Sequence, residues 1–156
     1  MLDSTEIAPS TWYSSETGMV MYSLGDQVGD VEPLRYSGVD LFPKTEYHTT
    51  LVSVRRDIPE PALEAVFVDA LSNFLADNPV AVAELGAERY FCTKNEEATV
   101  VAPVHVIGER ALRAFVQTFI PDYDPFFHVT LLKNSQTKYG IRISSAEDLA
   151  ERCVQI

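Results

Sequence analysis

The sequence predicts an α+β fold that forms a single domain over residues 1–156. Three observations predict it: the length of the chain, its composition, and an alternation of strand-like segments with amphipathic helices. A chain of 156 residues can bury one core of ordinary size, and an apolar content of 46% is typical of a globular protein. The segments follow the order strand, strand, helix, three times over. This order predicts sheets backed by helices on one side.

The first strands and the first helix are predicted by apolar patterning. Residues 18–24 ("GMVMYSL") are apolar between two glycines, and residues 48–54 ("HTTLVSV") combine β-branched side chains with alternation, so both segments predict strands. Residues 25–46 are rich in Gly, Pro and Asp and predict a loop with little regular structure. A helix is predicted within residues 59–79 because apolar residues recur there at helical spacing: Leu63, Val66, Phe67, Ala70, Leu71, Phe74 and Leu75.

The middle of the chain predicts a hairpin followed by a second helix. Residues 89–93 and 99–108 are strand-like and flank the polar turn "KNEEA", and Pro103 indicates an edge or a bulge in the second of these strands. A helix is predicted over residues 109–119, with an apolar stripe formed by Leu112, Phe115, Val116 and Phe119.

The last part of the chain predicts two more strands and a short helix. The strands are expected over residues 127–133 and 139–143. The helix is expected over residues 144–153, with Ser144 or Ser145 as its N-cap.

The charge of the chain limits its partners. The net charge is −11, from 12 basic and 23 acidic residues, which disfavours binding to long nucleic acid through many phosphate contacts. A small anionic ligand in a locally basic pocket is compatible with this charge. No apolar run approaches the roughly 20 residues that a membrane-spanning helix needs, so no membrane partner is expected.

Two features indicate a cytoplasmic protein. The N-terminal residues "MLDSTEIAPS" lack the basic and apolar regions of a secretory signal. Cys92 and Cys153 lie far apart and form no CxxC pair, so we interpret them as reduced thiols, with a disulfide as the alternative. Nothing in the sequence indicates an oligomeric state.

A doubled motif carries the chemistry. His-x-Thr-Leu occurs as "HTTL" at His48 and as "HVTL" at His128, within two predicted strands, and composition alone would produce such a pair on the order of once in ten thousand chains. Since residues i and i+2 of a strand share a face, each histidine projects beside the threonine that follows it, Thr50 or Thr130. If the strands are adjacent, two imidazoles face each other between two hydroxyls.

This set of groups suits the cleavage of a phosphodiester. One neutral imidazole can accept the proton of the attacking oxygen, and one charged imidazole can donate a proton to the leaving oxygen. The threonine hydroxyls can donate hydrogen bonds to the phosphate oxygens, where charge develops in the transition state. No metal ion or cofactor is required, and three scattered histidines with two distant cysteines show no metal-ligand spacing. The near symmetry of the motifs leaves open which histidine is the base.

The two motifs, separated by a helix, a hairpin and a second helix, resemble those of the 2H phosphoesterase superfamily. This group includes RNA 2′-5′ ligase-like proteins, cyclic nucleotide phosphodiesterases, and phage enzymes that destroy cyclic oligonucleotide signals. "KTEYHTTLVSV" is similar to the first family motif and "PDYDPFFHVTLLK" to the second. The resemblance implies a bilobal, pseudo-symmetric fold, with two antiparallel sheets facing a central cleft and helices outside. It also implies that His48, Thr50, His128 and Thr130 are catalytic.

Other side chains are weaker candidates for the site. Several aromatic residues could stack on a nucleobase: Trp12, Tyr13, Tyr47, Phe126 and Tyr139. Four basic residues near the motifs are interpreted as solvated charges: Lys44, Arg55, Arg56 and Lys133. Strand alternation directs Arg55 and Lys133 away from the motif histidines, and His105 is interpreted as structural or exposed.

The expected function is therefore metal-independent hydrolysis of a small nucleotide phosphodiester. The candidate substrates are a cyclic oligonucleotide, a 2′,3′-cyclic phosphate or a 2′-5′ linkage. The alternatives are a phage counter-defence enzyme specific for cyclic oligonucleotide signals, and a protein that binds a nucleotide without cleaving it. A third alternative, RNA processing, would need a basic groove that the sequence does not indicate.

Overall fold

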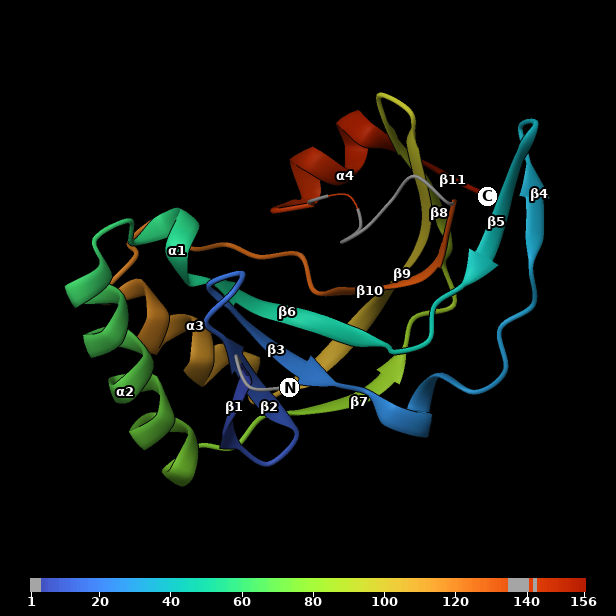
Figure 1. Cartoon of the computed structure of the whole chain (residues 1–156). Coiled ribbons are helices and arrows are strands. Elements are labelled where there is room, and N and C mark those ends of the chain that lie inside the picture. The colour runs from blue at the N-terminus through green and yellow to red at the C-terminus, as the bar shows by residue number, and fades with distance from the viewer. Residues whose placement is uncertain (1–3, 135–140, 142) are drawn as a thin grey trace.

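The computed structural model describes residues 4–134, 141 and 143–156, and most of its strands belong to one curved antiparallel sheet (Figure 1). The main path of this sheet runs β1-β2-β3-β6-β10-β9-β8-β11, while β5 also pairs with β10 and β4, and β7 pairs with β9. The strands are β1 (Ser4–Ala8), β2 (Thr11–Ser14), β3 (Met19–Ser23), β4 (Leu34–Tyr36), β5 (Val39–Pro43), β6 (His48–Ser53), β7 (Ala81–Leu85), β8 (Tyr90–Lys94), β9 (Glu97–Ile107), β10 (His128–Lys133) and β11 (Cys153–Gln155).

The expected α+β class is confirmed, but the strands are not divided into two separate sheets. β6 and β10 are neighbours and are joined by one bridging pair, Thr49 with Val129. This pair connects the strands β1, β2 and β3, on the β6 side, to β9, β8 and β11, on the β10 side. The main apolar core contains residues from the strands on both sides of this pair: Val20 and Val52 from β3 and β6, and Val100 and Val129 from β9 and β10. The two motif strands therefore lie at the centre of a connected sheet.

Four α-helices and a short 3-10 helix belong to the described residues: α1 (Val54–Asp57), α2 (Pro61–Asp77), α3 (Glu109–Gln117), α4 (Ala146–Arg152) and η1 (Gly25–Val28). α2 and α3 lie side by side at one end of the molecule (Figure 1), where the rings of Phe74 and Phe115 stack with centroids 4.4 Å apart. Both helices were predicted, and so was the cap of α4, whose Ser145 side chain accepts a hydrogen bond from the Asp148 amide. Within the described part of the chain, no helix has the length and apolar character needed to cross a membrane.

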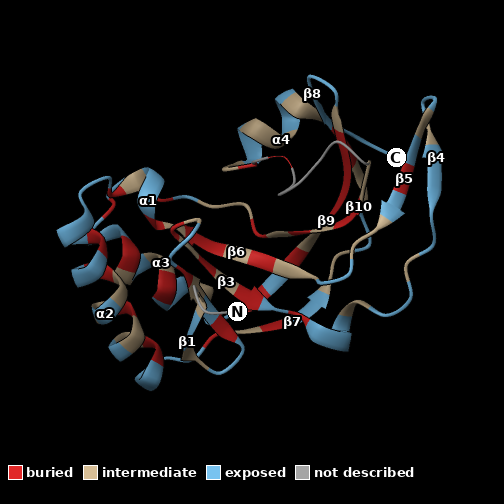
Figure 2. Cartoon of the chain, viewed as in Figure 1, coloured by how far each residue is buried: buried red, intermediate tan, exposed pale blue. Residues whose placement is uncertain are grey.

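The buried face of α2 agrees with the predicted stripe except at its start. α2 buries one side against the core (Figure 2), with Phe67, Leu71 and Leu75 of the stripe among its buried residues. Leu63 and Val66 are instead 50% and 58% exposed, whereas Glu64 is only 6% exposed. The Glu64 carboxylate is held by the Arg55 guanidinium, with nitrogen–oxygen distances of 3.2 and 3.0 Å, and by the Tyr13 hydroxyl. These hydrogen bonds compensate the burial of a charge, and the Arg55 bond in particular lowers the pKa of Glu64.

Several strands were not predicted. The segment expected to be a loop contains the β4–β5 hairpin, in which Tyr36 pairs with Val39. The two residues between them, Ser37 and Gly38, have φ angles of 53° and 78°, as a type I′ turn requires. β1, β2, β7 and β11 were missed as well, because short strands of three to five residues, few of them buried, show little hydrophobic periodicity.

The predicted β8–β9 hairpin is confirmed, and Pro103 lies where β9 changes partners. Residues 97–101 of β9 pair with β8, and residues 104–107 pair with β7. Pro103 falls between these two ladders, so its missing amide hydrogen leaves neither ladder incomplete. The strand predicted over residues 139–143 is not found at Ile141 and Ile143, which are buried outside any strand, and its other positions lie outside the described residues.

The interpretation of the cysteines as reduced thiols is wrong in this structure. Cys92 and Cys153 form a disulfide. They face each other directly, because β11 pairs with β8 in a register that sets Cys153 opposite Cys92. Without β11, which the sequence pattern did not predict, nothing indicated that the two side chains would meet.

Candidate active site

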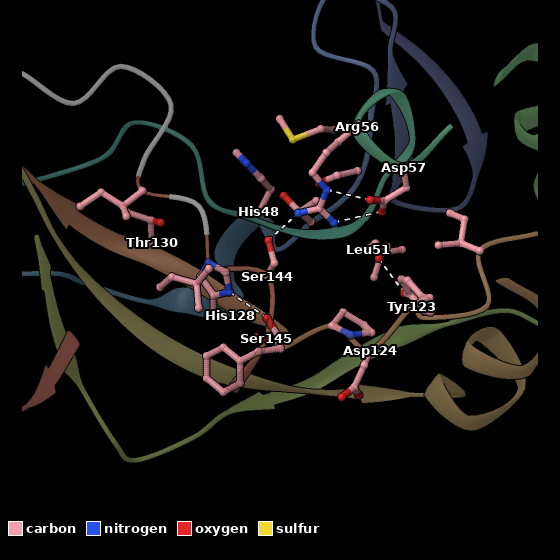
Figure 3. A pocket seen from close by; sticks show the side chains of 18 of the residues that line it. His48, Leu51, Arg56, Asp57, Tyr123, Asp124, His128, Thr130, Ser144 and Ser145 are labelled. Carbon is pink, nitrogen blue, oxygen red and sulfur yellow. Dashed lines mark hydrogen bonds and ion pairs between the residues drawn. The ribbon is translucent and has the colours of Figure 1, made fainter. Parts of the chain in front are cut away.

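Residues of both His-x-Thr motifs line one cleft of about 590 Å³. Its walls include both motif histidines and both motif threonines: His48, Thr50, His128 and Thr130. The pairing of Thr49 with Val129 fixes the antiparallel register, so His48 lies across from Thr130 and His128 across from Thr50. Figure 3 shows the two imidazoles reaching toward the same space from the neighbouring strands β6 and β10.

The two motif strands share the same irregularity as well as the same residues. In β6 the pairing with β3 shifts across Leu51, and in β10 the pairing with β9 shifts across Leu131. Both strands have the same burial pattern, in which the second, fourth and fifth residues are buried. Each strand therefore contains a β-bulge at the leucine of His-x-Thr-Leu.

The two strands pair only briefly, which leaves room between the site residues. β6 and β10 are each six residues long, yet they share one bridging pair. A regular ladder would bring the Cβ atoms of facing residues to about 4.5–5.5 Å from each other, too close to admit a phosphate group between their side chains. The limited pairing of β6 with β10 therefore leaves space between the motif side chains.

The upper walls of the cleft come from α1, from residues 120–126 and from the segment before α4. Arg56 of α1 binds the Asp57 carboxylate through two nitrogens, at 2.9 and 3.0 Å, and also donates to the Ser144 hydroxyl. Tyr123, five residues before His128, donates its hydroxyl hydrogen to the carbonyl oxygen of Leu51 at 2.7 Å (Figure 3). Tyr123 thus connects the segment that leads into the second motif to the bulge of the first.

His128 is held in one orientation. Its Nδ1 lies 2.9 Å from the carbonyl oxygen of Phe126, and its ring stacks on that of Phe126 with centroids 5.6 Å apart. A carbonyl can only accept, so Nδ1 carries the hydrogen, and the neutral ring has its lone pair on Nε2. Burial lowers the pKa of His128, and the hydrogen bond to Phe126 partly opposes this effect. At neutral pH the ring is therefore a proton acceptor.

His48 has different surroundings. Burial, followed by the charges of Lys44 and His128, lowers the pKa of His48 to about 4. Among the described residues, no hydrogen-bond partner holds the His48 ring. His48 is thus neutral in the empty cleft, and an anion placed beside it and Lys44 would favour its protonated form.

The threonines of each motif divide as strand alternation predicts. Thr50 and Thr130 are half-buried and line the cleft, whereas Thr49 is completely buried on the opposite face of β6. The Thr49 hydroxyl finds no hydrogen-bond partner in the described part of the chain. Thr49 thus belongs to the core and not to the site.

Of the four predicted stacking residues that the structure describes, one lies at the cleft. Phe126 lines it, but Trp12, Tyr13 and Tyr47 do not. Trp12 is 38% exposed on β2, two strands away from β6, while Tyr13 is bound to Glu64 and Tyr47 packs against the core. Tyr139 lies outside the described residues.

Sequence reasoning missed Lys44 and Arg56, which line the cleft although they were interpreted as solvated charges. Alternation directed Arg56 toward the side of His48 but too far along the strand to reach the site. Arg56 lines the cleft because the strand ends at Ser53 and the chain turns into α1 there. His105 is exposed on β9, as expected, and is not part of the cleft. The acidic residues Asp122 and Asp124 also line the cleft, and only their position next to the motif segment "PDYDPFFHVT" hinted at this.

The described residues contain no group of three or more His, Cys, Asp or Glu side chains that could hold a metal ion. The motif residues contribute two imidazoles and two hydroxyls to the cleft, beside cationic and carboxylate groups of its walls. Comparison with known proteins finds no family model that matches the chain, no similar curated protein and no similar solved structure.

Proposed function

We propose that this protein is a metal-independent phosphodiesterase of the 2H phosphoesterase type that hydrolyses a small nucleotide phosphodiester. The observation that carries the proposal is the meeting of both His-x-Thr motifs in one cleft, on neighbouring strands that share the same bulge. Two imidazoles and two hydroxyls that line one cleft provide the proton transfers and hydrogen bonds that this reaction needs. The equivalence of β6 and β10 is local support for the pseudo-symmetric two-lobed arrangement of that superfamily.

In this proposal His128 is the general base and His48 the general acid. The Nε2 lone pair of His128 takes a proton from a water molecule as the water oxygen forms a bond to phosphorus. The bond from phosphorus to the leaving oxygen breaks, and protonated His48 gives its proton to that oxygen. The products are a phosphomonoester and an alcohol, and exchange with solvent restores both imidazoles. Thr50 and Thr130 donate to the non-bridging oxygens.

The protonation of His48 depends on the substrate. The pKa of His48 is about 4 in the empty cleft, with burial and the charges of Lys44 and His128 as the causes. A bound phosphodiester carries a negative charge that offsets these effects and favours the imidazolium. In this way the acid is charged mainly in the complex, where it is used.

The test is a screen of purified protein against cyclic oligonucleotides, 2′,3′-cyclic mononucleotides and 2′-5′-linked dinucleotides, with products identified by mass spectrometry. We expect cleavage of at least one compound at a rate that excess EDTA does not change. The control is a His48→Ala/His128→Ala double variant from the same preparation procedure, which reports contaminating nucleases. Absence of cleavage with retained binding would favour a nucleotide-binding protein instead. Loss of activity in EDTA, restored by a divalent ion, would contradict the mechanism.

A further inference from the structure

We propose that Lys44 and Lys133 form a second phosphate-binding subsite beside His48, so that the preferred substrate is an oligonucleotide with a phosphate in addition to the one that is cleaved. The inference rests on the proposed function and specifies its substrate class. It distinguishes a di- or oligonucleotide from a nucleoside 2′,3′-cyclic phosphate, which offers one phosphate only.

Among the described residues of the cleft wall, the cations are Lys44 and Arg56. Lys44 follows β5, lines the cleft together with His48 and His128, and is half-buried. Arg56 is bound to Asp57 and Ser144. In the described part of the chain, no carboxylate forms an ion pair with Lys44. Its ammonium group is therefore available to an anionic ligand.

Lys133 faces the same side of the sheet because of the bulge in β10. Leu131 and Leu132 are consecutive and both buried, so they point to the same face, and the alternation restarts one residue late. Lys133 consequently returns to the face of His128 and Thr130. This corrects the expectation from simple alternation, which directed Lys133 away from the motif histidines.

The register of β5 brings the two lysines together. Leu132 pairs with Pro43 and Lys133 with Phe42, so Phe42 and Lys133 are neighbours on one face of the sheet. Lys44 follows directly after the end of β5 at Pro43, one residue beyond the pairing with Leu132. Burial, and next the charge of Lys133, lowers the pKa of Lys44, while Glu46 acts in the opposite direction. Lys133 is not among the residues that line the cleft, so it would extend the site beyond Lys44. Two ammonium groups that repel each other, in a protein with a net charge of −11, suit a bound phosphate.

Two aspartates, Asp122 and Asp124, also line the cleft, and the Asp124 carboxylate is paired with the Arg113 guanidinium at 2.8 Å. In the described part of the chain, neither aspartate forms an ion pair with Lys44 or Lys133. Phe42, which is 51% exposed beside Lys133, offers a ring on which the base attached to the second phosphate can stack.

The experiment compares two substrates that share the scissile linkage: a 2′-5′-linked dinucleotide with and without a 5′-phosphate. For the wild-type protein we expect a higher kcat/KM for the phosphorylated compound. Lys44→Gln and Lys133→Gln should each reduce this preference about tenfold or more, mainly through KM, because each removes a charge-assisted hydrogen bond. Lys44→Arg should retain the preference. Arg110→Gln, on α3 and outside the cleft lining, is the matched control and should change neither substrate.

The ratio between the two substrates is the readout that isolates the subsite, since Lys44 also lowers the pKa of His48 and its loss can alter turnover of every substrate. Equal loss on both substrates, or a wild-type protein without preference, would overturn the proposal. Calorimetric binding of the same pair separates the two levels of inference. If neither compound is cleaved but the phosphorylated one binds more tightly in a lysine-dependent way, the subsite stands and the proposed function fails. If binding is equal and lysine-independent, the subsite fails.

Discussion

The strands β6 and β10 carry the same motif with the same bulge, yet their histidines have different partners. His128 donates from Nδ1 to the Phe126 carbonyl and stacks on the Phe126 ring. His48 has no described hydrogen-bond partner and lies near the charge of Lys44. The strands place both imidazoles in the cleft. The protonation of each imidazole then depends on its neighbours, the Phe126 carbonyl for His128 and the charge of Lys44 for His48. A repeated motif therefore does not imply a repeated chemical role.

The largest expected effect separates the two histidines. His128→Ala removes the proposed base and should reduce cleavage of a nucleotide substrate and of a nitrophenyl ester alike, by about 10²–10⁴-fold. His48→Ala removes the proposed acid and should reduce nucleotide cleavage by a similar factor but largely spare the nitrophenyl ester, which leaves without a proton. The measurement is kcat on both substrates for both variants. The reverse pattern would exchange the roles, and equal failure on the ester would indicate phosphate binding by both imidazoles.

A second test asks whether the threonines are as equivalent as the strands. Thr50→Val and Thr130→Val should each lower kcat by about 10²–10³-fold, because each removes a donor to the transition state. Thr49→Val is the matched control on the opposite face. Since the Thr49 hydroxyl has no described partner, its removal should leave kcat unchanged and should not destabilise the fold. Comparable loss of activity in Thr49→Val would show that the wrong face of β6 has been assigned to the site.

This face assignment shows what could be predicted from the sequence and what could not. Alternation places His48 and Thr50 together, and five of the strands (β3, β6, β8, β9 and β10) and the helices α2 and α3 follow from local patterns. The position of Lys133 does not, because the bulge depends on how β10 fits against β9, and no local pattern marks it. Arg56 and Lys44 depend in the same way on the turn into α1 and on the pairing of β5 with β10.

The two strands also differ in the hydrogen bonding of their bulges. The Leu51 carbonyl accepts a hydrogen bond from Tyr123, whereas no side chain among the described residues donates to the Leu131 carbonyl. Tyr123→Phe should lower the free energy of unfolding by about 1–3 kcal/mol, because it leaves a buried carbonyl without its donor. Tyr22→Phe is the control and should have little effect, because Tyr22 is 9% exposed and its hydroxyl makes no hydrogen bond in the described part of the chain. Denaturant titration measures both, and equal stabilities of the two variants would contradict the role of Tyr123.

The smallest expected effect is a pH dependence of stability. The pKa of His48 is lowered from 6.5 to about 4, so the unfolded chain binds a proton at a higher pH than the folded protein does. This contribution to stability is complete above about pH 6.5 and decreases as the pH falls toward 4, with a loss of about 2 kcal/mol between pH 7 and pH 5. Denaturant titrations at pH 7 and pH 5 should show the loss, and His48→Asn should reduce it. An unchanged loss in that variant would assign the pH dependence to other groups.

The disulfide gives the two motifs different positions in the covalent topology of the chain. Cys92 and Cys153 close a ring across a sequence separation of 61, and this ring contains β9, α3 and His128. His48 lies outside it, on the open N-terminal part of the chain. By the chain-entropy relation, such a ring stabilises the native state by about 4 kcal/mol through restriction of the unfolded ensemble. Reduction therefore frees the unfolded chain only between Cys92 and Cys153, the segment that contains the proposed base, while the unfolded segment around the proposed acid keeps the freedom it already had.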